Sequence, residues 1–200
     1  MLDVGAGEAP WKDLLTGAEY VGLDLASNSE FGMQRRPGII YYSGDRLPVD
    51  DASFDHVLCV EVLEHVREPL PFLAELGRAL RPGGSLALTV PWSARVHHQP
   101  WDYARFTPQG LTELLSAAGF TQVTVEERGS DLAVIANKLL VLVIRMLRSE
   151  GHDSLLWRLP AAACLAPLAA GFLTAAHLSL LLGRGSKEDP LGYAAVAVKG

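Results

Sequence analysis

The sequence predicts an α/β protein with a doubly wound, mostly parallel sheet, and two observations carry this prediction. Short apolar runs of strand length alternate along the chain with segments whose apolar residues recur at helical spacing. The first run, Leu2–Val4, breaks into the turn Gly5-Ala6-Gly7, and a second run about twenty residues later ends near Asp24. In α/β folds such glycines let the backbone approach a ligand, and the acid accepts hydrogen bonds from ribose hydroxyls. The chain is therefore expected to bind a nucleotide.

Length and composition limit the class of protein. The chain has 200 residues, enough for one domain with a sizeable core. Its net charge of −6 argues against a general nucleic-acid binder, which usually presents a basic face. Cys59 and Cys164 stand in apolar surroundings, so we expect no disulfide framework and favour a reducing cytosol.

The first half of the chain supplies five strands and two helices. A short helix is expected around Trp11–Leu15. A longer one is expected at Pro69–Leu80, where leucines recur at helical spacing. Arg81-Pro82-Gly83-Gly84 should terminate the longer helix, because proline and glycine cannot continue it. The expected strands are Leu2–Val4, Tyr20–Leu25, Gly38–Ser43, Phe54–Val60 and Ser85–Val90.

The second half adds one capped helix and two strands. Thr107 fits a helix N-cap and Pro108 the first turn of a helix that runs to Ala118, with Gly119 at its end. The run 120–127 alternates apolar and polar residues and predicts a strand, and 193–199 predicts the last one. Folds of this class commonly have a helix before their first strand. None precedes Leu2 here, which leaves open a start that is truncated or misassigned.

Six short motifs, in order and in register, carry a family resemblance over about residues 1–127. They read Leu-Asp-Val-Gly-Ala-Gly, Gly-Leu-Asp, Gly-Asp-x-Leu-Pro, Ser-Phe-Asp-x-Val, Val-Leu-Glu-His-Val and Leu-Arg-Pro-Gly-Gly. The chain resembles the class I S-adenosylmethionine-dependent methyltransferases, in the type 11 group that includes ubiquinone and menaquinone methylation enzymes. The resemblance implies a Rossmann-like sheet of seven strands whose last strand is antiparallel, with S-adenosyl-L-methionine as the cofactor.

The resemblance also implies roles for individual residues. Asp3, Gly5 and Gly7 would shape the loop around the methionine part of the cofactor. Asp24, with Leu25 beside it, would bind the ribose. Asp45, with Arg46 and Leu47, would meet the adenine, and Glu61 would lie near the methionine end.

Other interpretations of these residues remain open. Asp3 could instead be a structural acid that bonds local backbone amides, and Asp45 could stabilise an Asx turn. Nicotinamide-dependent reductases also bind their cofactor at a glycine turn that follows a strand. This interpretation is disfavoured because the turn Gly5–Pro10 offers no third glycine at the start of a helix.

The segment Pro91–Phe106 follows the fifth strand and is the most acceptor-like part of the chain. It concentrates His97, His98, Trp101, Asp102, Tyr103 and Arg105. His98, Asp102 and Tyr103 are the candidate catalytic residues: a histidine can take a proton from a hydroxyl nucleophile, and the aspartate can orient it. The alternative is an aromatic loop that packs over the site and transfers no proton.

Two further histidine patterns are weighed against simpler interpretations. Adjacent histidines diverge in an extended chain and no third ligand is evident, so His97 and His98 predict no metal site. Glu64 and His65 resemble a catalytic pair, but neighbouring residues do not share a helix face. Capping or packing at a helix start is the competing interpretation for His65.

A hydrophobic insert separates the last two strands, which suggests a core of residues 1–128, an insert of residues 129–190 and a final strand of residues 191–200. Hydrophobic residues make up 49% of the chain, and the excess lies in two stretches of the insert, Leu132–Ile144 and Leu159–Leu182. A single span would place the last two strands on opposite sides of a bilayer. The insert is therefore expected to be a re-entrant hairpin, an interfacial anchor, or an apolar lid or dimer surface.

These observations predict a methyltransferase that acts on a small or lipid-linked acceptor. Nucleic acid is not an expected partner, and contact with a membrane surface is. The expected location is the cytoplasm, with peripheral attachment at the inner membrane surface. An inactive, membrane-associated scaffold with the same fold is the alternative. The acceptor, the methylated atom and the oligomeric state stay open.

Overall fold

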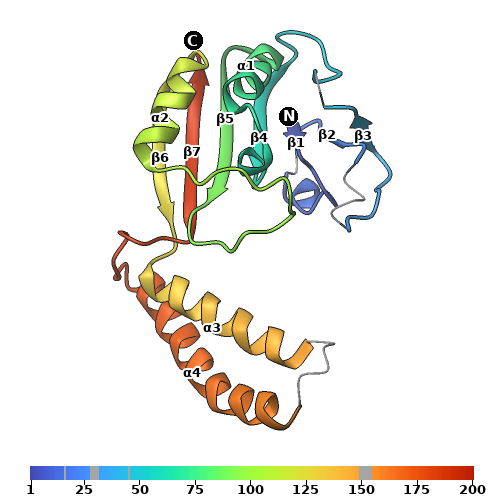
Figure 1. Ribbon diagram of the computed structural model, residues 1–200. Helices are drawn as coiled ribbons and strands as arrows, with labels where there is room; N and C mark the ends of the chain where they lie inside the picture. The colour runs from blue at the N-terminus through green and yellow to red at the C-terminus, as the bar shows by residue number, and fades with distance from the viewer. Residues whose placement is uncertain (16, 28–31, 45, 149–154) are drawn as a thin grey trace. The chain divides into compact units, whose positions relative to one another are not determined.

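The computed structural model describes the chain apart from residues 16, 28–31, 45 and 149–154 and the side chains of 155 and 156 (Figure 1). It divides into two compact units. Unit 1 comprises Met1–Glu126 and Tyr193–Gly200, and unit 2 comprises Glu127–Gly192.

Unit 1 is built on a seven-stranded sheet with the strand order β3-β2-β1-β4-β5-β7-β6. Its strands are β1 (Leu2–Val4), β2 (Val21–Leu25), β3 (Ile39–Tyr42), β4 (Phe54–Val60), β5 (Leu80–Pro91), β6 (Phe120–Arg128) and β7 (Gly192–Lys199). The pairs β1–β2, β1–β4, β2–β3 and β4–β5 are parallel. β7 runs against β5 and β6 in Figure 1. The predicted mixed sheet with an antiparallel last strand is confirmed.

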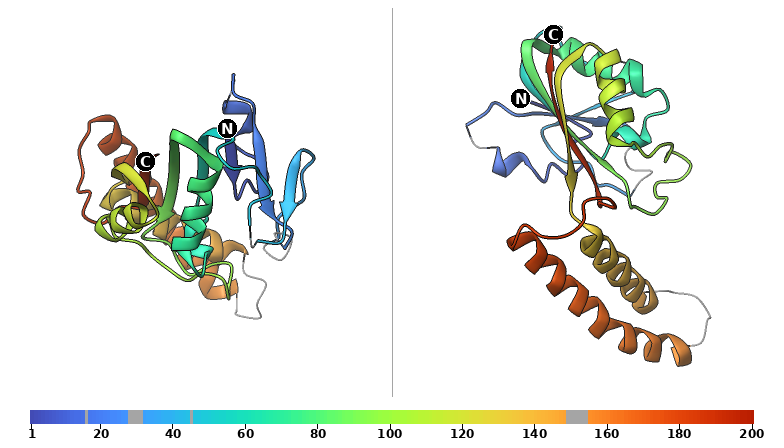
Figure 2. Two further views of the ribbon diagram at one scale, coloured as in Figure 1. Left: turned by 90° about the horizontal axis from the view of Figure 1, so that it is seen from above. Right: turned by 90° about the vertical axis from the view of Figure 1, so that its left-hand side faces the viewer.

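Two α-helices cover one face of this sheet, as the right-hand view of Figure 2 shows. They are α1 (Pro69–Ala79) and α2 (Pro108–Ala117). Thr107 caps α2 as predicted, because its hydroxyl oxygen accepts a hydrogen bond from the Gly110 amide at 3.1 Å. Buried leucines of both helices pack on apolar strands, which is the usual pattern for parallel strands inside a sheet.

Two predicted boundaries differ from the structure. The helix expected at Trp11–Leu15 is a single 3-10 turn, η1 (Lys12–Leu14). The helix before β5 ends at Ala79, close to the predicted end, but β5 starts at Leu80 instead of Ser85. Leu80 pairs with Phe54, and Ser85 pairs with His56. The proline and glycines between them therefore form a bulge inside the strand.

Unit 2 is a pair of packed helices, α3 (Asp131–Arg148) and α4 (Leu155–Leu181). Their shared core contains Val143 from α3 and the small residues Ala162 and Ala169 from α4. α4 continues through Pro160 and Pro167. It is curved in Figure 1, as expected where prolines remove helical hydrogen bonds. The two apolar stretches of the sequence are thus longer helices than expected.

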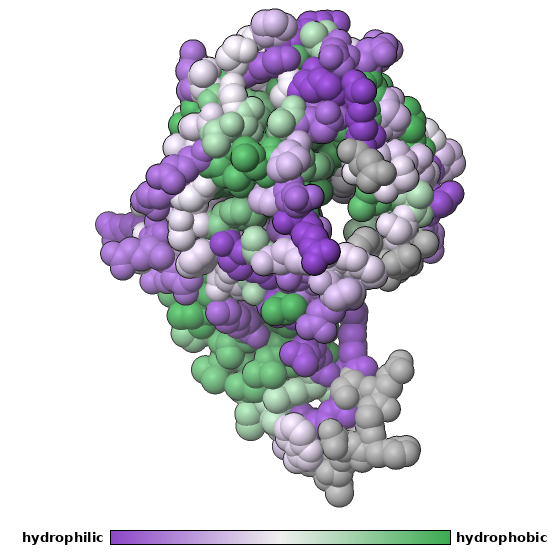
Figure 3. Space-filling view, turned by 45° about the horizontal axis from the view of Figure 1, so that its top comes forward, coloured by the Kyte–Doolittle hydropathy of each residue, from purple (hydrophilic) through white to green (hydrophobic). Residues whose placement is uncertain are grey.

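The surface of unit 2 is largely apolar. Among the described residues, one helix, Trp157–Leu181, is long and apolar enough to cross a membrane, and only 17% of its most apolar window is buried. Figure 3 shows apolar side chains gathered over the two helices. The exposed large side chains include Ile135, Leu140, Leu142, Ile144, Leu147, Trp157, Leu159, Leu168, Leu173, Leu178, Leu180 and Leu181.

Candidate active site

The loop after β1 is hydrogen-bonded to β2 and packs on a residue that follows β4. The amides of Gly5 and Ala6 both donate to the Leu23 carbonyl at 2.9 Å. Gly5 has φ +77°, and a Cβ built there would lie 2.2 Å from the Val62 Cγ2. Only glycine fits this position, because both the backbone angle and the contact exclude a side chain. The loop therefore packs directly on the residues that follow β4.

Asp24 lies at the end of β2 and is 8% exposed. Its Oδ2 accepts a hydrogen bond from the Gly7 amide at 2.9 Å, and its Oδ1 accepts one from the Leu25 amide at 2.7 Å. Each carboxylate oxygen can accept a second hydrogen bond. Asp24 thus fixes the glycine loop, and its carboxylate is an acceptor of the kind that ribose hydroxyls need.

Asp3 lies in β1 and is 1% exposed. The Tyr20 hydroxyl donates to its Oδ2 at 2.6 Å. Burial raises the pKa of Asp3, with a smaller contribution in the same direction from Asp24, while the Tyr20 hydrogen bond opposes the rise. The Tyr20 hydroxyl thus holds the Asp3 carboxylate in place just before the glycine loop.

Glu61 follows β4 and faces β5. Its backbone has φ +54°, its amide donates to the Thr89 carbonyl at 3.0 Å, and the Thr89 hydroxyl donates to its Oε1 at 3.0 Å. Val62, the next residue, is the one that Gly5 contacts. The structure thus brings the Glu61 backbone next to the glycine loop.

The segment predicted to meet the adenine is only partly described. Asp45 lies outside the described residues. Arg46 is exposed and pairs with Asp51 at 3.4 Å, while the Leu47 side chain is buried in the core.

Arg78 of α1 anchors this segment, and the sequence analysis missed it. Its guanidinium donates to the carbonyls of Leu47 and Val49 at 3.1 and 2.9 Å, and to the Asp51 carboxylate at 2.6 Å. Glu75 accepts two further bonds from the Arg78 Nε and one from its Nη2. The only available signal was an arginine three residues after a glutamate on a helix, which is common on protein surfaces.

The candidate catalytic residues lie in the loop between β5 and α2. Arg105 holds Asp102 in a two-pronged ion pair, with contacts of 2.6 and 2.9 Å, and this hydrogen bonding lowers the pKa of Asp102. Asp102 Oδ2 also accepts from the His97 amide at 2.9 Å and lies 3.2 Å from the His97 Nδ1. Tyr103 is 45% exposed. Asp102 therefore holds the loop in place through its bonds to Arg105 and to the His97 amide.

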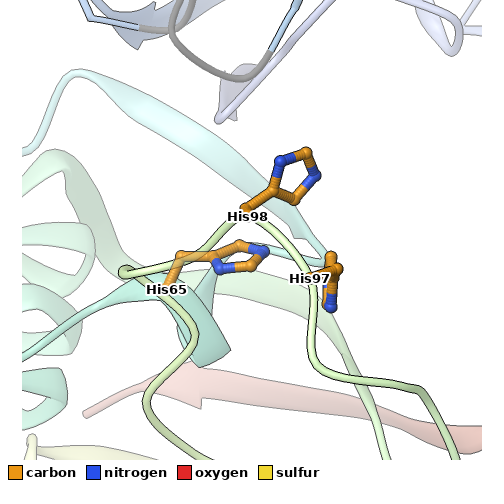
Figure 4. Close-up of side chains that lie close together, drawn as sticks. All are labelled: His65, His97 and His98. Atoms are coloured by element: carbon orange, nitrogen blue, oxygen red, sulfur yellow. The ribbon is translucent and has the colours of Figure 1, made fainter.

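Three imidazoles and a buried carboxylate meet beside this loop. His65 belongs to the short 3-10 helix η3 (Leu63–His65) after β4, and it lies together with His97 and His98 (Figure 4). Ring centroids are 4.8 Å apart for His65 and His97, 5.2 Å for His65 and His98, and 5.0 Å for His97 and His98. His98 has φ +50°, so the chain is not extended here, and the rings of the adjacent residues His97 and His98 lie close together.

Glu64 completes this cluster and was treated at the sequence level only as a partner of His65. It is 0% exposed, and burial raises its pKa to about 7. Its Oε1 lies 3.6 Å from the His65 Nε2 and 3.9 Å from the His97 Nε2. Burial also lowers the pKa of His65 and of His98.

Comparison with known proteins agrees with this geometry. Residues 2–88 match the family described as a methyltransferase domain. They include the glycine loop, Asp24 and Glu61, and the sheet has the seven strands and the antiparallel last strand expected above. Residues 2–88 thus resemble a methyltransferase domain, and the sheet has the fold of such domains.

Curated relatives of this chain are methyltransferases that act on different acceptors, as their names state. It is 39% identical over 95 residues to a demethylmenaquinone methyltransferase of Renibacterium salmoninarum, covering 44% of this chain and 39% of that protein. It is 40% identical over 124 residues to the phthiotriol/phenolphthiotriol dimycocerosates methyltransferase of Mycobacterium leprae, covering 56% of this chain and 46% of that protein. The chain therefore spans about half the length of such relatives, or less.

Solved structures show the same fold at low sequence identity. A methyltransferase from Archaeoglobus fulgidus matches 99% of this chain and 85% of its own, with a TM-score of 0.58 and 16% identity. The phosphoethanolamine N-methyltransferase 2 of Haemonchus contortus, solved with S-adenosyl-L-methionine, matches 100% of this chain and 48% of its own, with a TM-score of 0.54 and 18% identity.

S-adenosyl-L-methionine, the cofactor that the resemblance implies, fits the residues on these strands. A cofactor needs close approach of the backbone, and the loop after β1 has glycines with positive φ at positions 5 and 7. It also needs acceptors for ribose hydroxyls, and the Asp24 carboxylate oxygens are acceptors of that kind. These groups lie at the carboxyl ends of parallel strands, where open α/β sheets bind ligands.

Proposed function

We propose that this methyltransferase binds S-adenosylmethionine at the carboxyl ends of β1, β2 and β4 and transfers its methyl group to a small or lipid-linked acceptor. One observation carries the proposal. The glycine loop is bonded to Asp24 of β2 on one side and packs on Val62 after β4 on the other. Three motifs that are far apart in the sequence thus form one cradle.

The roles of the chain's own residues are binding and positioning. Asp24 accepts hydrogen bonds from the ribose hydroxyls, and Gly5 and Gly7 let the backbone approach the methionine part. Glu61 lies toward the methionine end. The adenine is assigned to the segment 45–47, in which Arg78 holds the Leu47 carbonyl. The cofactor supplies an activated methyl group on a positively charged sulfur, so alignment of the acceptor is the main task of the protein.

The acceptor is proposed to lie against the loop between β5 and α2. Proton removal from an acceptor hydroxyl falls to His98, with the exposed Tyr103 beside it in the loop. Asp102 is a positioning residue, because Arg105 occupies both of its oxygens and keeps it ionised. Its contact with His97 fixes the loop that carries His98.

The lipid-linked character of the acceptor is supported by unit 2. Residues 127–192 contain seven basic and six acidic residues, whereas the rest of the chain contains ten basic and seventeen acidic ones. α4 has no acidic residue, and α3 ends with Arg145 and Arg148. An exposed apolar pair of helices with basic residues at an end favours attachment to an anionic lipid surface. We therefore place the protein in the cytoplasm, peripherally attached to a membrane.

Turnover with a labelled cofactor tests this function. The full chain is incubated with methyl-labelled S-adenosylmethionine and either a membrane lipid extract or a pool of polar metabolites, and products are identified by mass spectrometry. A labelled lipid product is expected. A labelled polar product would replace the lipid-linked acceptor by a small one. Cofactor binding without turnover on either pool would support the inactive scaffold instead.

A further inference from the structure

The cluster of His65, His97 and His98 has the composition of a transition-metal site. One ring nitrogen from each residue lies within 4.8 Å of the other two, and the three side chains are half-buried. Nitrogen ligands about 2.0–2.1 Å from a tetrahedral zinc ion lie about 3.3 Å from one another. Small ring rotations of the histidines can close that difference.

Hydrogen bonds fix the ring form that metals require. The His65 Nδ1 lies 2.8 Å from the Trp101 carbonyl, and the His97 Nδ1 lies 3.1 Å from the Arg95 carbonyl. Carbonyl oxygens only accept, so each Nδ1 carries the hydrogen and each Nε2 carries a lone pair. A second bond from the ring to a carbonyl or carboxylate is the usual support of a metal-binding histidine. Asp102, 3.2 Å from the His97 Nδ1, adds such a carboxylate.

The buried carboxylate of Glu64 faces the three imidazoles. Both Glu64 carboxylate oxygens are buried, and neither has a hydrogen-bond partner among the described residues. Its Oε1 points to the Nε2 atoms of His65 and His97, at 3.6 and 3.9 Å. A buried carboxylate without partners is costly. A cation bound between the imidazoles would compensate it.

We propose that His65, His97 and His98 bind a divalent transition metal, with zinc as the ion of choice, and that Glu64 balances its charge. Imidazoles suit zinc, and three protein ligands leave one coordination position open. His97 and His98 belong to the loop assigned to the acceptor, so the open position would take an acceptor oxygen. A His98 that binds the ion cannot also be the base, so in the metal-bound protein the ion would lower the pKa of the acceptor hydroxyl in its place. That last role rests on the proposed function, whereas metal binding does not.

Zinc binding to the full chain tests the proposal. The protein is prepared without a polyhistidine tag, stripped with a chelator and titrated with zinc chloride against a chromophoric zinc indicator. One zinc ion per chain is expected. His65→Ala and His97→Ala should each weaken zinc binding at least about tenfold, and Glu64→Gln about tenfold. His56→Ala is the matched control, because His56 is exposed on β4 and bonded to Ser85, outside the cluster.

Substoichiometric binding by the wild-type chain would overturn the proposal. So would zinc affinities of His65→Ala and His97→Ala equal to that of His56→Ala. Circular dichroism checks that each variant is folded. Cobalt substitution of the wild-type chain gives an answer that needs no variant. A four-coordinate cobalt ion shows strong visible absorption, and its absence at one equivalent of cobalt contradicts the site.

Failure of this proposal is distinguishable from failure of the proposed function. Asp24→Ala should lose S-adenosylmethionine binding, measured by calorimetry, and still bind one zinc ion. A chain that binds the cofactor but no zinc contradicts the metal site alone. A chain that binds zinc but no cofactor contradicts the methyltransferase proposal alone.

Discussion

Asp24 is the residue on which cofactor binding is expected to depend most. Its oxygens hold the Gly7 and Leu25 amides and would also accept the ribose hydroxyls. Asp24→Ala should reduce the affinity for S-adenosylmethionine at least about hundredfold, because it removes two charge-assisted hydrogen bonds and loosens the loop. Isothermal calorimetry measures the change.

The control for this prediction is Asp55→Ala. Asp55 is an exposed carboxylate near the amino end of β4, where it pairs with Arg81. It lies away from the carboxyl ends of the strands, so its loss should leave cofactor affinity within about twofold. Equal affinities of the two variants would remove Asp24 from the site.

Gly5 tests the cradle without changing any polar group. Gly5→Ala combines a positive φ with a contact of 2.2 Å to the Val62 side chain, so it should destabilise the protein by about 3 kcal/mol. Gly83→Ala is the matched control. It has φ +74°, but none of the described atoms lies within 4 Å of its Cβ. About 1 kcal/mol of strain alone is expected there. Urea unfolding of both variants gives the comparison, and equal losses would contradict the packing of Gly5 on Val62.

At the scale of elements, Arg78 joins helix α1 to the segment that precedes β4. Arg78→Leu removes its bonds to the Leu47 and Val49 carbonyls and leaves Glu75 without its cation. We expect a loss of about 2–3 kcal/mol in the free energy of unfolding, together with weaker cofactor binding. Urea unfolding and calorimetry measure the two effects. Unchanged cofactor affinity would show that the segment does not contact the adenine.

The same ion pair predicts a pH dependence. Hydrogen bonding to Arg78 lowers the pKa of Glu75 below its ordinary value of 4.5. As the pH falls below about 5, the unfolded state takes up a proton at Glu75 before the folded state does. The stabilisation by the ion pair therefore decreases with falling pH, and it is lost once the pH passes below the lowered pKa of the folded state. Urea unfolding of the wild type and of Glu75→Gln should differ by up to about 1 kcal/mol at pH 7, and the difference should shrink as the pH falls below 4.5. A constant difference across this range would contradict the ion pair.

Patterns within one element were predictable from the sequence, whereas contacts between distant elements were not. The range of β4 and the cap at Thr107 follow from side-chain alternation and from local hydrogen bonding. The start of β5 was missed because the proline and glycines after Leu80 read as the end of a helix. In the structure they form a bulge inside the strand, and that bulge depends on pairing with β4. The meeting of His97 with the adjacent His98 depends on the left-handed backbone of His98, and the meeting of His65 with both is a contact between distant segments. A local reading of the sequence gives no sign of that turn.

At the scale of the whole molecule, the two units differ in the surface they present. Unit 1 holds the large apolar core, whereas unit 2 exposes leucines on most sides of α4. The double variant Leu168→Glu and Leu178→Glu places charges on two exposed positions of that helix. It should abolish flotation with anionic phospholipid vesicles, because each lost leucine removes about 1.5–3 kcal/mol of apolar burial.

Leu70→Glu provides the comparison for the flotation assay. Leu70 lies on α1 in unit 1 and, at 41%, is about as exposed as Leu173 of α4, at 40%. Its replacement should leave flotation unchanged. If the wild-type chain stays in the soluble fraction and light scattering reports a dimer that the double variant loses, the apolar face is a contact between two copies.

The position of unit 2 between β6 and β7 has a consequence for how such chains diversify. These strands are antiparallel neighbours, which a two-residue turn can join, and closing a longer connection costs only about 0.6 kcal/mol for each doubling of its length. Whole segments can therefore be exchanged at this one junction while the nucleotide half of the sheet is left untouched. A chimera with a foreign insert at this junction should therefore still form the seven-stranded sheet.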